Sequence, residues 1–236
     1  MAKLGHGYER VHGEIRYSGR VIMKADSASF EVFNKQWAKD KYRAYRHGDP
    51  VRGVDIDSFV ILNEIFSKDI SRVYFNIGNL KDVDAKTFTV LDVGKNFAGR
   101  VSVDNYLLID ETEYCGYAKD KEMVFFHTSS YGKPKKIKSA NVNTFQSIDY
   151  GYGKDDKRCF YKGVIVKGAD PDTLEVIGQY HAKDGKSVFY RGEKIVDANP
   201  EHFEMLDHPF VGNCRWAKDD RHIYCQERIH AVVVAK

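Results

Sequence analysis

The sequence predicts a mainly β protein: tandem β-hairpin repeats of about 29 residues with short helical turns, in a solenoid-like or propeller-like array. Three observations predict this fold. A Lys-Asp phrase recurs six times, a second phrase recurs with the same spacing, and 13% of the residues are aromatic, mostly Tyr and Phe. Aromatic residues favour strands, and self-similarity at a fixed period is typical of repeat architectures.

The first phrase is clearest in AKDGKSVFY, residues 182–190. Asp184-Gly185 between alternating residues predicts a two-residue type I′ hairpin turn, because both residues tolerate positive φ. The other copies lack this glycine, and there we expect looser turns in which the Asp side chain bonds the backbone. In every copy we expect the Asp to bend the chain, the Lys to point outward and the following aromatic residue to pack. The pairs are Lys39-Asp40, Lys68-Asp69, Lys119-Asp120, Lys154-Asp155, Lys183-Asp184 and Lys218-Asp219.

The second phrase is represented by ADPDTLEVI, residues 169–177. Asp170 as N-cap and Pro171 at the first helical position predict one or two helical turns. The aromatic residue or Leu of this phrase recurs at spacings of 29, 29, 18, 39, 29 and 29 residues, so the period is lost once and then recovered. Its positions are Phe30, Phe59, Phe88, Tyr106, Phe145, Leu174 and Phe203.

One unit is therefore predicted to contain a strand, a tight turn, a strand, a second turn, a short strand and a helical turn. Such units bury their faces only against neighbours. We predict a single repeat domain over residues 1–236, with a degenerate unit where the period is lost. The unit boundaries are approximately 15–34, 35–63, 64–92, 93–110, 111–149, 150–178, 179–207 and 208–236.

The recurring AKD(K/D)xxVFY and GxxIxGADPxTFxVL patterns resemble the bacterial DKNYY repeat family over roughly residues 15–230. Ile70-Ser71 and Asp156-Lys157 depart from this resemblance, because they stand where Lys-Asn is typical of the family. The resemblance implies a secreted or envelope-associated bacterial protein. Some similar repeat proteins accompany secreted toxins and act as their immunity proteins. The resemblance brings no catalytic residue with it.

Charge and hydropathy limit the partners and the compartment. The formal charge of +3 gives no general case for a nucleic acid or an anionic membrane as partner. No run of about 18 apolar residues predicts a membrane span. The N-terminal residues lack the apolar centre of a signal peptide, although removal of a leader would leave the same appearance. We therefore leave the compartment open between the cytoplasm and, if a leader was removed, the bacterial periplasm or cell envelope.

The cysteines give no clear chemistry. Cys214 and Cys225 are equidistant from Asp219-Asp220, which predicts that they face each other across a hairpin, either as free thiols or as a disulfide. Metal binding is disfavoured, because a Cys-x10-Cys spacing lacks the close ligand pair of zinc sites. Cys159 occupies a slot held elsewhere by Val, so a buried core position is expected. Cys115 is expected opposite Phe126. We expect no metal and no cofactor.

Two stretches with longer spacing are the candidate partner sites. Residues 132–140, GKPKKIKSA, carry Lys133, Lys135, Lys136 and Lys138, and we interpret them as a loop insertion of about six residues. Such a charge run either is simply solvated or contacts an acidic partner. Residues 206–214 contain Phe210, which either anchors a partner or caps the last unit.

These observations favour a non-catalytic protein-binding module. With the resemblance, the most concrete reading is an immunity protein that binds and sterically blocks a secreted toxin or effector. The alternative is a structural cell-envelope protein without a single tight partner. An enzyme would need His, carboxylate or thiol groups brought together from distant units, and no catalytic motif in the sequence supports one, so we expect no enzymatic activity.

Overall fold

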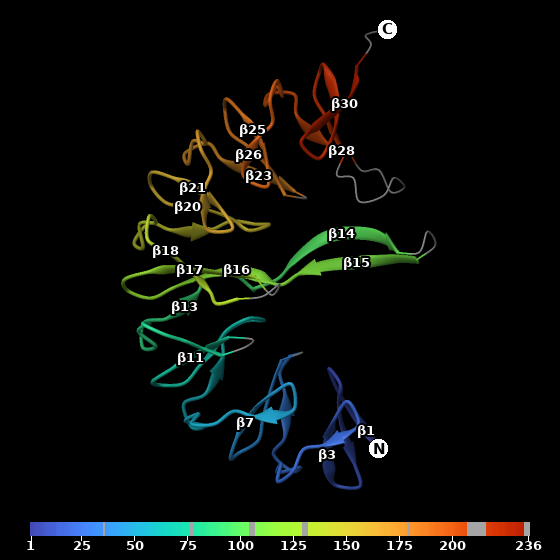
Figure 1. Cartoon of the computed structure of the whole chain (residues 1–236), viewed down its shortest axis with the longest axis vertical. Coiled ribbons are helices and arrows are strands. Elements are labelled where there is room, and N and C mark those ends of the chain that lie inside the picture. The colour runs from blue at the N-terminus through green and yellow to red at the C-terminus, as the bar shows by residue number, and fades with distance from the viewer. Residues whose placement is uncertain are drawn as a thin grey trace. The chain divides into compact units, whose positions relative to one another are not determined.

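The computed structural model describes residues 1–34, 36–75, 78–103, 107–128, 132–178, 180–206 and 216–233. All regular elements in these ranges are β-strands (Figure 1). No helix with the length and apolar character of a membrane span occurs in them. The chain divides into two compact units, unit 1 over Met1–Gly94 and unit 2 over Lys95–Lys236.

Unit 1 contains three four-stranded antiparallel sheets, each with its strands in chain order. The first contains β1 (Ala2–Gly5), β2 (Tyr8–Val11), β3 (Glu14–Tyr17) and β4 (Arg20–Val21). The second contains β5 (Glu31–Val32), β6 (Trp37–Lys39), β7 (Ala44–Arg46) and β8 (Asp49–Pro50). The third contains β9 (Val60–Ile61), β10 (Ser67–Lys68), β11 (Val73–Phe75) and β12 (Gly78–Leu80), and β13 (Thr89–Val90) follows it.

Unit 2 repeats the pattern after a different start. A two-stranded hairpin, β14 (Asn96–Val103) and β15 (Leu107–Glu113), is followed by the antiparallel strands β16 (Cys115–Lys119), β17 (Val124–Thr128) and β18 (Lys135–Ile137). Three four-stranded sheets complete the unit. They are β19 (Gln146–Ser147), β20 (Tyr152–Lys154), β21 (Cys159–Tyr161) and β22 (Val164–Ile165); β23 (Glu175–Gly178), β24 (His181–Lys183), β25 (Val188–Tyr190) and β26 (Glu193–Lys194); and β27 (Glu204–Met205), β28 (Trp216–Lys218), β29 (His222–Cys225) and β30 (Arg228–Val232).

The β14–β15 hairpin lies where the period is lost. Residues 93–110 were expected to hold a degenerate repeat unit, but they contain β14 and the start of β15, which pair only with each other in the strand order (Figure 1). Tyr106, the second-phrase residue assigned to that unit, lies outside the described residues. The 18- and 39-residue spacings therefore reflect an inserted hairpin.

The second phrase forms a turn and a strand instead of the predicted helical turn. The Asp170 carbonyl accepts hydrogen bonds from the amides of Thr173 (3.3 Å) and Leu174 (3.0 Å), and β23 begins at the next residue. The prediction of helical turns is wrong, because β23 gives its backbone groups to the pairing with β24. The sheets that begin with β5, β9, β19, β23 and β27 thus take their first strand from a second phrase.

Apolar clusters join neighbouring sheets within each unit. In unit 1, Phe30 lies between Tyr8 and Tyr45, with ring centroids at 5.6 and 5.3 Å. In unit 2, Phe203 lies between His181 and Tyr224, at 5.8 and 5.3 Å. The aromatic residue of the second phrase is therefore the contact between one sheet and the next, which confirms the expected mutual burial of repeats.

The type I′ turns occur at a different place from the one predicted. Lys183 pairs with Val188, which leaves a four-residue loop in which Asp184 accepts the amides of Lys186 (2.8 Å) and Ser187 (2.7 Å). Positive φ at both central residues, 51° and 82°, is found instead at Arg191-Gly192. The prediction at Asp184-Gly185 is wrong, because the Asp184 carboxylate turns inward to bind the loop amides and is only 6% exposed.

Candidate functional site

The six Lys-Asp pairs carry most of the recurring chemistry, and the Asp side chains organise their own loops. Asp69 accepts the amides of Ser71 (2.8 Å) and Arg72 (2.7 Å) through one carboxylate oxygen. The same pair of bonds recurs at Asp40, Asp120, Asp155, Asp184 and Asp219. The expected backbone bonding by the Asp side chain is therefore confirmed in the five copies without a glycine after the Asp, and Asp184 makes the same bonds in place of the predicted type I′ turn.

The second carboxylate oxygen reaches back to the preceding second phrase. Asp69 accepts the Asp55 amide at 3.1 Å and the Tyr74 hydroxyl at 2.6 Å. Burial by itself would raise the pKa of Asp69, but the hydrogen bonds from Tyr74 and the backbone amides outweigh it and lower the pKa. The amide bond recurs at Asp40, Asp155, Asp184 and Asp219.

Four of the six Lys side chains reach forward instead of pointing outward. Lys68 Nζ donates to the carbonyl oxygens of Ala85 (3.0 Å) and Phe88 (2.9 Å) in the following second phrase. The predicted outward direction is wrong for Lys68, Lys119, Lys154 and Lys183, which all donate to such carbonyls. A Lys-Asp pair thus connects the phrase before it to the phrase after it.

A buried aromatic side chain two residues before each of these Lys residues makes a further connection. The Tyr152 hydroxyl donates to the Tyr180 carbonyl and accepts the Gly192 amide, both at 3.0 Å, and burial raises its pKa. His181 occupies the same position one repeat later, and its Nε2 lies 3.1 Å from the Gln226 carbonyl oxygen. These side chains join adjacent sheets.

The predicted basic segment lies on an outer strand. Lys135 and Lys136 belong to β18 and pair with Phe126 and Phe125 of β17. The predicted insertion of about six residues lies between β17 and β18, because Phe126 pairs with Lys135 nine residues later, whereas the equivalent Tyr190 pairs with Glu193 three residues later. The buried Ile137 returns β18 to the frame of the repeat, so Lys135 and Lys136 lie on a repeat strand and not in the inserted loop. Lys133 and Lys138 flank β18, and the side chains of Lys133, Lys135 and Lys138 are exposed.

The structure adds an arginine that sequence reasoning missed. Arg158, in the β20–β21 loop, donates from Nη1 to the Ser139 carbonyl oxygen at 2.7 Å, directly beside Lys138. Arg43 and Arg72 make the same contact in their own repeats, with the carbonyls of Lys24 and Gly53. The recurrence of Arg three residues after the Asp was the available signal, but its carbonyl partner lies 19 residues earlier in the chain.

The remaining predicted site residues are only partly placed. Phe210 and Cys214 lie outside the described residues, so the proposed disulfide stays a prediction. Cys225 is in register with Trp216, so the expected symmetry about Asp219-Asp220 is wrong: the loop spans residues 219–222. Cys115 likewise pairs with Thr128 and not with Phe126.

Cys159 is fully buried, as expected, and burial raises the pKa of its thiol to about 12. A thiol with such a pKa is a poor nucleophile at neutral pH. Within the ranges that the structure describes, no group of three His, Cys, Asp or Glu side chains is placed to hold a metal ion.

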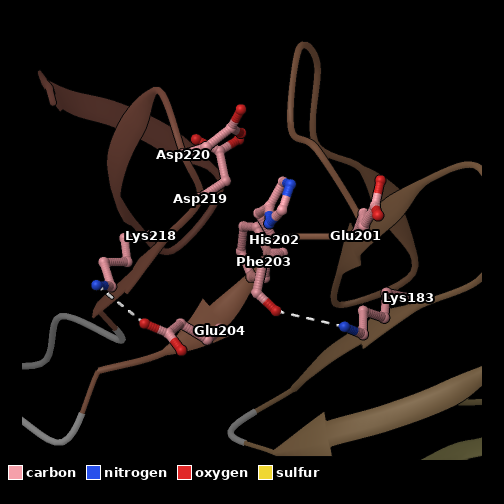
Figure 2. Close-up of a pocket in the computed structure, with 8 residues that line it drawn as sticks. All are labelled: Lys183, Glu201, His202, Phe203, Glu204, Lys218, Asp219 and Asp220. Carbon is pink, nitrogen blue, oxygen red and sulfur yellow. Dashed lines mark hydrogen bonds and ion pairs between the residues drawn. The ribbon is translucent and has the colours of Figure 1, made fainter. Parts of the chain in front are cut away.

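A polar hollow of about 500 Å³ lies beside the last Lys-Asp pair (Figure 2). Glu204 and Lys218 form an ion pair of 3.0 Å at one side, and Lys183 donates to the Phe203 carbonyl at the other. A second hollow of about 340 Å³ lies beside Asp40 and includes the equivalent Glu31 and Lys39. Because the hollow recurs with the repeat, we attribute it to repeat geometry.

The sheets and their connections define a β-repeat protein. A family model for the DKNYY family matches residues 37–193, more than half of the chain, and the chain belongs to that family. The resemblance read from the repeated phrases is thereby confirmed. Searches of curated proteins and of solved structures found no match.

Proposed function

We propose that this protein is a non-catalytic protein-binding module, and specifically a bacterial immunity protein that binds and sterically blocks a secreted toxin or effector. The observation that carries the proposal is the structural use of the recurring polar groups. The two carboxylate oxygens of Asp69 accept hydrogen bonds from five donor groups, and Lys68 and Tyr152 connect adjacent sheets. Groups engaged in this way are poor candidates for acid–base catalysis.

The surface of the repeats varies while the connections stay constant. The residue after the Asp is Ile70 in one loop of unit 1, 62% exposed, and Asp156 in one loop of unit 2. Tyr42, at the tip of another loop, is 61% exposed. Function commonly lies in such variable loops on a rigid scaffold, and Tyr is among the residues that anchor interfaces.

The mechanism proposed is occlusion. An interface of about 1,600 Å² with a few central anchors is usual for a specific complex. Residues at the loop tips and on β18 would cover the mouth of the partner's active site without supplying chemistry of their own. The alternative, a structural envelope protein, requires no such one-to-one complex.

The test is co-expression with the product of the neighbouring gene. We expect the two proteins to co-purify as a stable one-to-one complex, and we expect cells that express the repeat protein to survive the toxin. A neighbouring toxin that neither binds this protein nor is neutralised by it would count against the proposal. Hydrolase assays of the purified protein, with Cys and His substitutions as controls, test the enzymatic alternative.

A further inference from the structure

We propose that unit 2 binds its partner through a cationic surface that two neighbouring sheets build together, and that this surface receives an acidic protein face. The cationic surface consists of Lys133, Lys135 and Lys138 around β18, and Lys157 and Arg158 in the β20–β21 loop. This inference rests on the proposed function, since it names the contact region and the chemistry of the partner.

Charge is concentrated in this part of the chain. Residues 132–158 contain seven basic and three acidic side chains, whereas the formal charge of the whole chain is only +3. Asp155 is buried and bonded to its own loop. Asp156 accepts hydrogen bonds from Thr144 and Asn141, which lower its pKa and keep it ionised. The rest of the chain is close to neutral, so the segment dominates the electrostatic field nearby.

Arg158 joins the two parts of the surface. Its bond to the Ser139 carbonyl brings the β20–β21 loop against the turn that follows β18, where Lys138 is exposed. A guanidinium has five N–H donors and binds carboxylates in a bidentate manner. Because the contact with Ser139 already restrains the side chain, less entropy is lost when a carboxylate binds.

An acidic protein fits better than a nucleic acid or a lipid surface. Asp156 stands directly before the two cations of the loop, Lys157 and Arg158, and would repel a continuous row of phosphates. Pro134 and Ile137, the apolar residues in and beside β18, are buried and unavailable for insertion into a bilayer. Carboxylates on a folded protein can be spaced to meet the lysines and avoid Asp156.

The surface can be tested before a partner is known, with fluorescent poly-L-glutamate as the probe. We expect anisotropy to report binding that weakens as salt rises, because exposed charges are screened over about 8 Å at physiological ionic strength. The double variant Lys135→Glu, Lys138→Glu should bind at least about tenfold more weakly, since each side chain changes from attraction to repulsion. Unchanged affinity in this variant would overturn the proposal, as would equal or tighter binding of duplex DNA or of anionic vesicles by the wild type.

The last repeat supplies a control for the arginine, at a position two residues after its Asp instead of three. Arg221 also donates to a backbone carbonyl, that of Asp197 at 2.8 Å, but it lies outside the cationic surface. Arg158→Gln should weaken binding of the probe several-fold, and Arg221→Gln should leave it unchanged. Equal effects of the two variants on binding would reduce Arg158 to a structural role and contradict its assignment to the surface.

The outcomes separate the two proposals. If a toxin partner is found and binds the Lys135→Glu, Lys138→Glu variant as tightly as the wild type, the cationic surface is wrong and the immunity function stands. If no toxin is bound or neutralised but the variant loses poly-L-glutamate, the immunity function fails and the surface stands. Circular dichroism of each variant should match that of the wild type, because Lys135 and Lys138 are exposed.

Discussion

The Asp69 loop in unit 1 and the Asp155 loop in unit 2 show what the repeat keeps and what it changes. Both carboxylates accept the amides two and three residues on, at 2.8 and 2.7 Å in each loop. Tyr74 adds a hydroxyl bond of 2.6 Å to Asp69, but Phe160 stands in the equivalent place beside Asp155. The backbone bonds are therefore the constant part of the repeat, and the tyrosine bond is an addition.

Removal of the carboxylate of Asp69 or Asp155 should give the largest loss in the free energy of unfolding. Asp69→Ala leaves three amides and the hydroxyls of Ser71 and Tyr74 without this acceptor, and Asp155→Ala leaves three amides. We expect a loss of about 3–4 kcal/mol in the free energy of unfolding for Asp69→Ala and about 1 kcal/mol less for Asp155→Ala. Urea denaturation followed by circular dichroism measures both, with the transitions of the two units fitted separately. Losses below about 1 kcal/mol would show that water replaces the carboxylate easily.

The two units should also respond to acid in different ranges. In unit 2, burial lowers the pKa of His127 to about 4 from 6.5. Its neutral form contributes fully to stability above about pH 6.5, and that contribution is lost as pH falls towards 4, by at most about 3 kcal/mol. In unit 1, the lowered pKa of Asp69 gives stability that is present above pH 3.8 and lost only below it.

Unfolding measured at pH 7, 5 and 4 should therefore show unit 2 weakening first. His127→Gln is the matched variant, because it keeps a polar side chain and removes the titration. The same decline between pH 6.5 and 4 in the variant would assign the effect to another group.

Exchange of Tyr and Phe at positions 74 and 160 should give the smallest change in the free energy of unfolding. Tyr74→Phe removes the hydroxyl bond to Asp69, with an expected cost of about 1 kcal/mol. Because this change also raises the pKa of Asp69 towards its usual value, the difference from wild type should shrink only below pH 3.8, as pH falls through the lowered pKa of the wild-type carboxylate. Phe160→Tyr tests whether Asp155 accepts a hydroxyl in the same way. A stability change at pH 7 that does not shrink in acid would mean that Tyr74 acts through packing alone.

The sequence was informative wherever a contact is local or strictly periodic. The Asp turns of the five copies without the glycine, the packing of Phe30 and Phe203, and the buried Cys159 all follow from short patterns. The strands after the second phrase were missed, because Asp170-Pro171 is also a good helix start and the choice between helix and strand depends on pairing with β24.

The hydrogen bonds between repeats were also not predictable, because they too depend on partners that are distant in the sequence. The carbonyls that accept the Lys68 bonds lie 17 and 20 residues later, and no side chain marks them in the sequence. Arg158 reaches back to a carbonyl in the same unmarked way. The predicted strand partner of Cys225 was wrong, because the loop between β28 and β29 is longer than the two-residue turn that the prediction assumed. Phe210 and Cys214 fall outside the described residues, so their roles stay predictions.

The forward reach of the Lys and the backward reach of the Asp have a consequence for how such a chain can change length. Deletion of part of a repeat separates a Lys or Asp side chain from the backbone carbonyl or amide that it bonds. Deletion of one whole repeat instead places each Asp after another copy of the second phrase, which offers the equivalent amide. Addition or deletion of whole repeats should thus conserve the hydrogen bonds between neighbouring sheets. The number of exposed loops can therefore change, in evolution or by engineering, without a redesign of the scaffold.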